Sequence, residues 1–161
     1  MKILTYPHPF LNRKSIPVKI FNKNLHQLCQ KMFELMYKQN GVGLAATQTG
    51  LPHSILVANQ TKKTSDEIML INPRIIKTSK ETCEEEEGCL SFPGLSAKVK
   101  RSVKITCQSF NLEGEKTISD FEGLLSRVIQ HEIDHLNGIL FIDRLPEDKK
   151  KLLIKNYLSA K

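Results

Sequence analysis

The chain has 161 residues, of which 40% are hydrophobic, and it carries a net charge of +7. This length suits a single domain with its own core over residues 1–161, since no change of composition marks a second domain. The longest apolar runs are far too short to span a bilayer, and the first residues lack the apolar stretch of a signal peptide. We therefore expect a cytoplasmic protein that neither crosses a membrane nor is exported.

The first half of the chain predicts one helix followed by short strands. Apolar residues recur at helical spacing over residues 24–40, and Gly41 is expected to end this helix. A loop of small residues, 41–50, leads to strands expected at residues 55–58 and 68–76, with a turn at Asn72. The four glutamates at 84–87 are expected to be solvated, with a functional role only for the last of them.

The second half predicts three more strands and two helices. The strands are expected at residues 98–104, 103–109 and 116–121. A long helix follows, with Asp120 as a candidate N-cap and Gly138 just past its end, and Pro146 begins a basic terminal helix. This order predicts an α+β fold: short, mostly antiparallel sheets packed around the long helix, with an N-terminal and a C-terminal helix.

Four cysteines, at positions 29, 83, 89 and 107, form no C-x-x-C pair. Without a secretory signal, they indicate reduced thiols in a cytosol-like compartment. Cys29 lies on the apolar face of the first helix, and Cys107 continues the alternation of a strand, so both are expected in the core. Packing patterns assign no place to Cys83 or Cys89.

The long helix contains the sequence QHEIDH at residues 130–135, which has the pattern H-E-x-x-H. Histidines four positions apart lie one above the other on a helix, so His131 and His135 can bind one metal ion. Glu132 lies about 100° around the helix from His131, where a general base can take a proton from a metal-activated water. Such a short pattern also occurs by chance on amphipathic helices.

The rest of this helix predicts the surroundings of the two histidines. A helical wheel places a core stripe on one side, formed by Leu125, Ile129, Ile133 and Leu136. A polar stripe, expected to face solvent, consists of Arg127, Gln130 and Asp134. The two histidines share a third face with Leu124 and Val128, so they are expected to face an apolar wall.

A catalytic metal needs a third protein ligand as well as an open position for water. A metzincin would have histidine where this chain has Phe141, and it would have a later methionine. Some metallopeptidases take a glutamate ligand from a helix further downstream. The only such glutamate here is Glu147, and its expected place at a helix start fits that ligand position poorly. Cys89 is the best upstream candidate, since glycine and proline residues form a turn around it; the alternative is a buried loop cysteine.

Three separated stretches, GVGLAATQ at 41–48, EGCLS at 87–91 and QHEIDH at 130–135, closely resemble the three signature motifs of peptide deformylases. They occur in the same order with similar separations, and the resemblance covers nearly the whole chain. It implies hydrolytic removal of the formyl group from the N-terminal formylmethionine of newly made polypeptides, with release of formate. It also implies that Cys89, His131 and His135 bind the metal and that Glu132 is the general base and acid.

The resemblance further implies that the Gln48 side-chain amide and the Leu90 backbone N–H stabilise the charge that develops on the formyl oxygen. We expect the pocket for the methionine side chain to be formed by Val42, Leu90, Leu124 and Val128. In the family the peptide pairs with edge segments near the glycine-rich and cysteine loops, which implies substrate contacts at Gly43, Glu87 and Gly88. Some relatives have an arginine shortly after the cysteine loop where this chain has LSA at 95–97, so peptide contacts beyond methionine are not implied.

A mixed sulfur and nitrogen ligand set suits zinc, iron, cobalt or nickel, and the resemblance implies ferrous iron as the physiological ion. Lysines at 149, 150, 151 and 155 give the hypothesis that the terminal helix docks on the ribosome. No arginine-rich or aromatic-interleaved stretch accompanies them, so neither specific DNA binding nor a membrane partner is expected. The alternatives are a metallopeptidase and a non-catalytic binding relative; the presence of Glu132 and Gln48 weighs against the latter.

Overall fold

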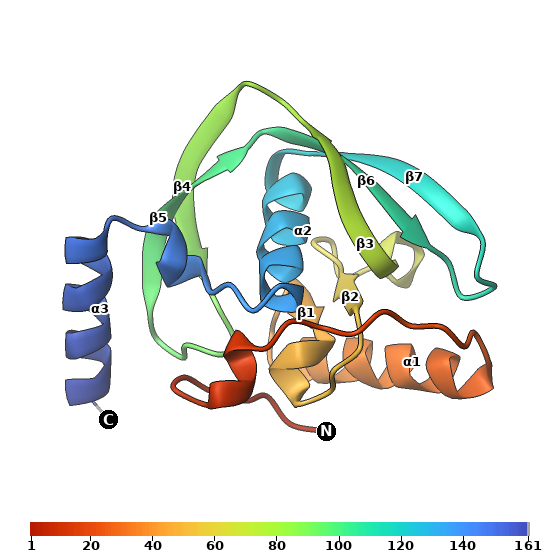
Figure 1. The fold of residues 1–161 in the computed structure, drawn as a ribbon, viewed down its shortest axis with the longest axis horizontal. Helices are drawn as coiled ribbons and strands as arrows, with labels where there is room; N and C mark the ends of the chain where they lie inside the picture. The colour runs from red at the N-terminus through yellow and green to blue at the C-terminus, as the bar shows by residue number, and fades with distance from the viewer. Residues whose placement is uncertain (161) are drawn as a thin grey trace.

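Five strands form an antiparallel sheet that arches over the helix α2 (Gly123–Leu136) in the computed structural model, which describes residues 1–160 (Figure 1). The strand order is β1-β2-β3-β6-β7. These strands are β1 (Gly43–Ala45), β2 (Ile55–Ala58), β3 (Ile68–Thr78), β6 (Lys104–Phe110) and β7 (Lys116–Glu122). Two further strands, β4 (Thr82–Gly88) and β5 (Ser96–Ser102), form a separate antiparallel hairpin. The predicted α+β class, with mostly antiparallel sheets around the long helix, is confirmed.

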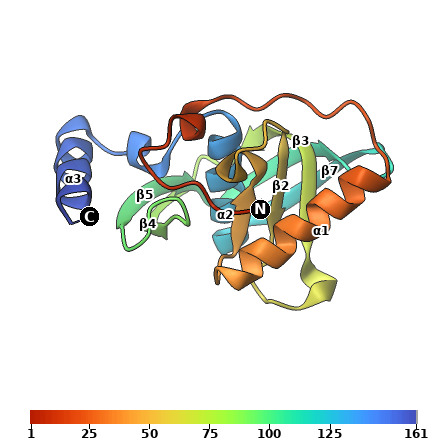
Figure 2. The ribbon, with the colours of Figure 1, turned by 90° about the horizontal axis from the view of Figure 1, so that it is seen from below.

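Two more helices flank this arrangement. The helix α1 (Lys23–Lys38) packs its apolar face, which includes Cys29, against buried residues of β1 and β2. The helix α3 (Glu147–Ser159) follows the short helix η4 (Phe141–Arg144) and lies at the opposite end of the molecule from α1 (Figures 1 and 2). Within residues 1–160, no helix combines the length and the hydropathy that crossing a membrane requires.

The helix α2 is buried on nearly all sides, and every residue from Ser126 to Leu136 is inaccessible or nearly so. The predicted core stripe is confirmed, and the structure shows that it packs in one cluster with residues of β2, β6 and β7. The prediction that Arg127, Gln130 and Asp134 face solvent is wrong. These three residues are buried because the β4–β5 hairpin and its neighbours cover the polar side of the helix and supply its hydrogen-bond partners.

The acidic run at 84–87 is solvated at Glu84, Glu85 and Glu86, as predicted, but the sequence did not predict that the run forms most of strand β4. Glutamate has low strand propensity, so the local sequence does not indicate a strand here. The register compensates for the charge: Glu84 lies opposite Lys100 and Glu86 lies opposite Lys98. The side chain of Glu87 is buried beneath the hairpin, so the run has one face in water and one against α2.

Three boundaries differ from prediction for local reasons. The chain enters α2 at Gly123 (φ 60°) with Glu122 at the N-cap, whereas Asp120 lies within β7 and accepts a hydrogen bond from Thr106. The helix α1 ends before Gly41 because Asn40 already adopts a left-handed conformation (φ 55°). At Asn72 (φ 51°) strand β3 continues through a bulge instead of turning.

Candidate metal centre

Three side chains from two segments bring sulfur and nitrogen atoms together beneath the sheet. Cys89 Sγ lies 3.2 Å from His135 Nε2, which lies 3.2 Å from His131 Nε2. All three ligand atoms lie within 4.8 Å of one another. A tetrahedral ion with ligand distances of about 2.0 to 2.3 Å needs ligand atoms about 3.3 to 3.6 Å apart. The cluster therefore fits a divalent ion with three protein ligands and one remaining position.

Helix geometry and a strand ending explain this convergence. His131 and His135 lie one turn apart on the buried side of α2, as their spacing predicts. Cys89 follows directly after β4, at the start of the loop that returns to β5. The structure thus brings together the three residues that the sequence singled out as ligands, although Cys89 and His131 are far apart along the chain.

Glu132 lies beside the cluster against the glycine-rich segment. A Cβ added to Gly43 would stand 2.5 Å from Glu132 Oε1 and 2.8 Å from a methyl group of Val128. Burial is the main cause that raises the pKa of Glu132 to about 7, and the nearby His131 opposes the rise. The other carboxylate oxygen, Oε2, is buried and has no hydrogen-bond partner within residues 1–160. A carboxylate with this pKa can accept and return a proton near neutral pH.

Gln48 lies on the short helix η2 (Ala46–Thr49), which follows β1. Its Oε1 accepts a hydrogen bond of 2.9 Å from the Ala45 N–H, and its Nε2 donates to Ser91 Oγ at 3.2 Å. The same Nε2 lies 3.6 Å from Cys89 Sγ. These contacts fix the amide so that its donor end, not its oxygen, points toward the cluster.

A cavity of about 560 Å³ opens beside these residues. Nearly every residue that the sequence assigned to catalysis, metal binding or substrate contact lines this cavity: Val42, Gly43, Gln48, Glu87, Gly88, Cys89, Leu90, Leu124, Val128, His131 and Glu132. Val42 and Leu124 are exposed at its rim, whereas Val128 is buried deeper. His135 lies behind the cavity, where it closes the ligand cluster.

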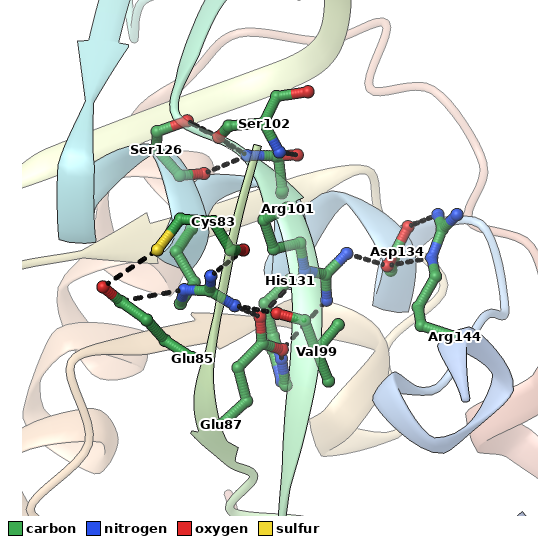
Figure 3. Close-up of polar contacts among 12 residues, drawn as sticks. Cys83, Glu85, Glu87, Val99, Arg101, Ser102, Ser126, His131, Asp134 and Arg144 are labelled. Atoms are coloured by element: carbon green, nitrogen blue, oxygen red, sulfur yellow. Dashed lines mark hydrogen bonds and ion pairs between the residues drawn. The ribbon is translucent and has the colours of Figure 1, made fainter. Parts of the chain in front are cut away.

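Glu87 borders the cavity, and its carboxylate is engaged with protein groups. It accepts a hydrogen bond of 2.9 Å from His131 Nδ1, two from Arg101 at 2.8 and 3.0 Å, and one from Arg127 at 2.7 Å (Figure 3). Burial raises the pKa of this carboxyl group, but the bonds from His131 and Arg101 and their charges outweigh that effect and bring the pKa to about 2. Glu87 is therefore ionised, and it fixes which ring nitrogen of His131 faces the cluster.

Sequence reasoning missed Arg101 and Arg144 and misplaced Arg127 and Asp134. Arg101 Nη1 donates to Asp134 at 2.5 Å, and Arg144 Nε donates to the same oxygen at 3.0 Å. The only local signal is the spacing of Arg127 and Asp134, seven positions apart on one side of α2. Their partners come from β4, β5 and η4, and no periodicity within a single segment indicates that these segments meet.

Comparison with known proteins agrees with this geometry. Residues 1–151 match the family model for polypeptide deformylase. A peptide deformylase of Rhizobium meliloti is 39% identical over 160 residues, which cover 98% of this chain and 92% of that protein. One of Acidobacterium capsulatum is 46% identical over 155 residues, covering 95% of this chain and 91% of that protein.

Solved structures show the same similarity in three dimensions. The crystal structure of a peptide deformylase from Legionella pneumophila superposes with a TM-score of 0.92 at 36% sequence identity, and covers 99% of this chain and 94% of that one. Sequence and fold therefore agree along nearly the whole chain. The chain belongs to the polypeptide deformylase family, the metal-dependent hydrolases that remove the N-formyl group from newly made polypeptides.

Proposed function

We propose that this chain hydrolyses the formyl amide of N-formylmethionyl nascent peptides at the site formed by Cys89, His131, His135 and Glu132. The observation that carries the proposal is the convergence of three metal-ligating atoms beside a buried carboxylate, at the inner end of a cavity. Formate and a peptide with a free N-terminal methionine are the products.

Cys89, His131 and His135 would hold one divalent ion. Such an ion supplies a Lewis acid that makes water nucleophilic near neutral pH and polarises the formyl oxygen. We propose ferrous iron as the physiological ion, while zinc, nickel and cobalt suit the same ligand set. Metal analysis of protein purified without oxygen tests this choice: iron at about one equivalent supports it, and zinc alone contradicts it.

Glu132 would act first as general base and then as general acid. Its carboxylate takes a proton from the attacking water and later gives it to the departing amine nitrogen of methionine. The buried Oε2 and the raised pKa support this role, because the group is ready to change its protonation state near neutral pH. Gly43 leaves the space that this carboxylate occupies.

The side-chain amide of Gln48 and the backbone N–H of Leu90 would donate to the formyl oxygen as negative charge develops there. The orientation of Gln48 supports this role, since its acceptor end is bound by Ala45 and its donor end faces Cys89. Both donors are neutral and are held before the reaction, so they need little reorganisation during it.

The substrate peptide would lie in the cavity between β1 and the loop after β4. β1 is an edge strand of the five-stranded sheet and can accept another strand, with Gly43 and Gly88 beside the peptide backbone. Val42, Leu90, Leu124 and Val128 would surround the methionine side chain. Glu87 would contact the substrate through its backbone, since its carboxylate already binds His131.

Release of formate from formyl-Met-Ala-Ser tests the function. The protein is loaded with ferrous iron without oxygen, or with nickel as a stable substitute, and formate is measured by a coupled dehydrogenase assay. We expect turnover with the formylated peptide and none with Met-Ala-Ser. Cleavage of a peptide bond in the unformylated peptide would support a metallopeptidase instead, and no turnover by metal-loaded protein would contradict both.

We also propose that the protein acts in the cytoplasm on chains leaving the ribosome, with α3 as a docking helix. Lys149, Lys151 and Lys155 support this idea, whereas Lys150 is bound to Asp143 at 2.7 Å and stabilises η4. Reversing the charges of the three lysines should reduce co-sedimentation with ribosomes. Unchanged co-sedimentation would contradict this proposal and leave the enzymatic one intact.

A further inference from the structure

A continuous series of charged contacts runs from the metal centre to the protein surface. His131 Nδ1 lies 2.9 Å from Glu87 Oε2, and Glu87 Oε1 lies 2.8 Å from Arg101 Nε. Arg101 Nη1 lies 2.5 Å from Asp134 Oδ2, which lies 3.0 Å from Arg144 Nε. Figure 3 shows these side chains in sequence, from Glu87 to Arg144.

The series crosses four separate segments of the chain. Glu87 is on β4, Arg101 on β5, Asp134 on α2 and Arg144 on η4. Both ligand histidines are on α2, and the cysteine ligand follows β4. The contacts therefore connect the two parts of the ligand set with each other and with the segment that leads to α3.

Burial makes the members of the series depend on one another. The side chains of Glu87 and Arg101 are each 4% exposed and that of Asp134 is 8% exposed, whereas Arg144 is 45% exposed. Removing one member of a buried ion pair leaves a charge without compensation, so the remaining groups must rearrange. Arg144 binds both carboxylate oxygens of Asp134, and without it Asp134 would depend on Arg101 alone among these arginines.

We propose that Asp134 and Arg144 are positioning residues for the metal site, which hold Arg101 and Glu87 so that Glu87 orients the imidazole of His131. The inference rests on the proposed role of Cys89, His131 and His135 as ligands. A carboxylate on the second nitrogen of a ligand histidine fixes the ring and strengthens its binding to metal. Through these contacts, a half-exposed arginine next to α3 sets how firmly the site holds its ion.

The test compares Arg144→Met and Asp134→Asn with a matched control. Lys150→Met removes an ion pair of 2.7 Å between α3 and η4, close to Arg144 in sequence, and Lys150 forms no hydrogen bond or ion pair with a member of the series among the described residues. Arg144→Lys keeps the charge and loses the two-point contact with Asp134. All four variants are prepared as full chains loaded with nickel or with cobalt.

Two measurements separate positioning from a general effect on stability. One is the rate of nickel release to a chromogenic chelator, and the other is the visible spectrum of the cobalt form, which reports ligand geometry. We expect Arg144→Met and Asp134→Asn to release nickel at least about threefold faster, below the 10- to 100-fold loss for a direct partner of a ligand histidine. Their cobalt bands should shift. Arg144→Lys should give a release rate and a spectrum between those of Arg144→Met and the unaltered chain, and Lys150→Met should match the unaltered chain.

The result that overturns the inference is a release rate and a cobalt spectrum in Arg144→Met and Asp134→Asn equal to those of Lys150→Met, whatever the change in melting temperature. If Arg144→Met does not fold, Arg144→Lys and Asp134→Asn carry the comparison. Cys89→Ala separates this failure from a failure of the ligand assignment. That variant should lose the sulfur-to-cobalt absorption; if it keeps the absorption, the ligand set itself is wrong.

Discussion

The carboxylate of Glu132 lies against the backbone of Gly43, and a Cβ at position 43 would stand 2.5 Å from Glu132 Oε1. Gly43 has no positive φ, so the space that it leaves, and not its backbone freedom, explains the glycine here. The relation connects the glycine-rich segment with the proposed general base. A side chain at position 43 would therefore displace the carboxylate of Glu132 and affect catalysis.

We expect Gly43→Ala to lower kcat about a hundredfold, because a displacement of the base by about 1 Å can cost that much. Metal content should stay near one equivalent. Gly88→Ala is the comparison, since its added Cβ meets nothing closer than 3.9 Å, and any effect should fall on KM. Steady-state kinetics with formyl-Met-Ala-Ser measure both, and an unchanged kcat for Gly43→Ala would contradict the proposed position of Glu132.

Gln48→Glu should lower kcat by about 10²- to 10³-fold, the usual cost of removing one donor to a developing negative charge. The substitution keeps an acceptor for the Ala45 N–H and replaces the donor that faces Cys89. The measurement is kcat at saturating substrate together with metal content. A variant with full metal and unaltered kcat would remove Gln48 from the catalytic group.

Leu124→Ala should separate substrate binding from stability. The side chain of Leu124 is 53% exposed at the rim of the cavity, so its loss should change the free energy of unfolding by less than about 0.5 kcal/mol. The value of kcat/KM for formylmethionyl substrate should fall about tenfold, a usual cost of losing apolar contact in a pocket. For the unaltered chain, equal kcat/KM for formyl-norleucine and formyl-glycine peptides would disprove the methionine pocket.

Cys29 should make stability fall at high pH. Burial raises the pKa of its thiol from 9.0 to about 12. Above pH 9.0 the unfolded chain loses this proton and the folded chain keeps it, so folding loses up to about 1.4 kcal/mol per pH unit. Urea unfolding should show a smaller loss between pH 9 and pH 11 for Cys29→Ala; parallel curves would contradict the assignment.

Periodicity predicted α1, α2 and most of the sheet because each has an apolar face that recurs within one segment. It failed for β4, where the glutamates form a strand only because β5 provides lysines opposite them and α2 covers Glu87. Tertiary pairing determines that this segment forms a strand, and no local sequence pattern indicates that strand.

In the candidate site, too, local spacing predicted some residues, whereas others depend on tertiary packing. His131, Glu132 and His135 follow from spacing on one helix, and resemblance to the family motifs supplied Cys89, Gln48 and Leu90. Arg101, Asp134 and Arg144 could not be predicted, because charged residues on a helix or strand are usually solvated. Only the packing of β4, β5 and η4 on α2 shows that Arg101 and Asp134 are buried and that the half-exposed Arg144 binds Asp134.

The most direct test of the proposed mechanism is formate release by a Glu132→Ala variant that has been shown to carry one equivalent of nickel. Glu132 does not belong to the ligand cluster, so we expect the variant to keep its metal and to lose turnover of formyl-Met-Ala-Ser. Cys89→Ala, measured beside it, should lose the metal as well. Formate release by the Glu132→Ala protein at the rate of the unaltered chain would contradict the assignment of Glu132 as the proton carrier of this site.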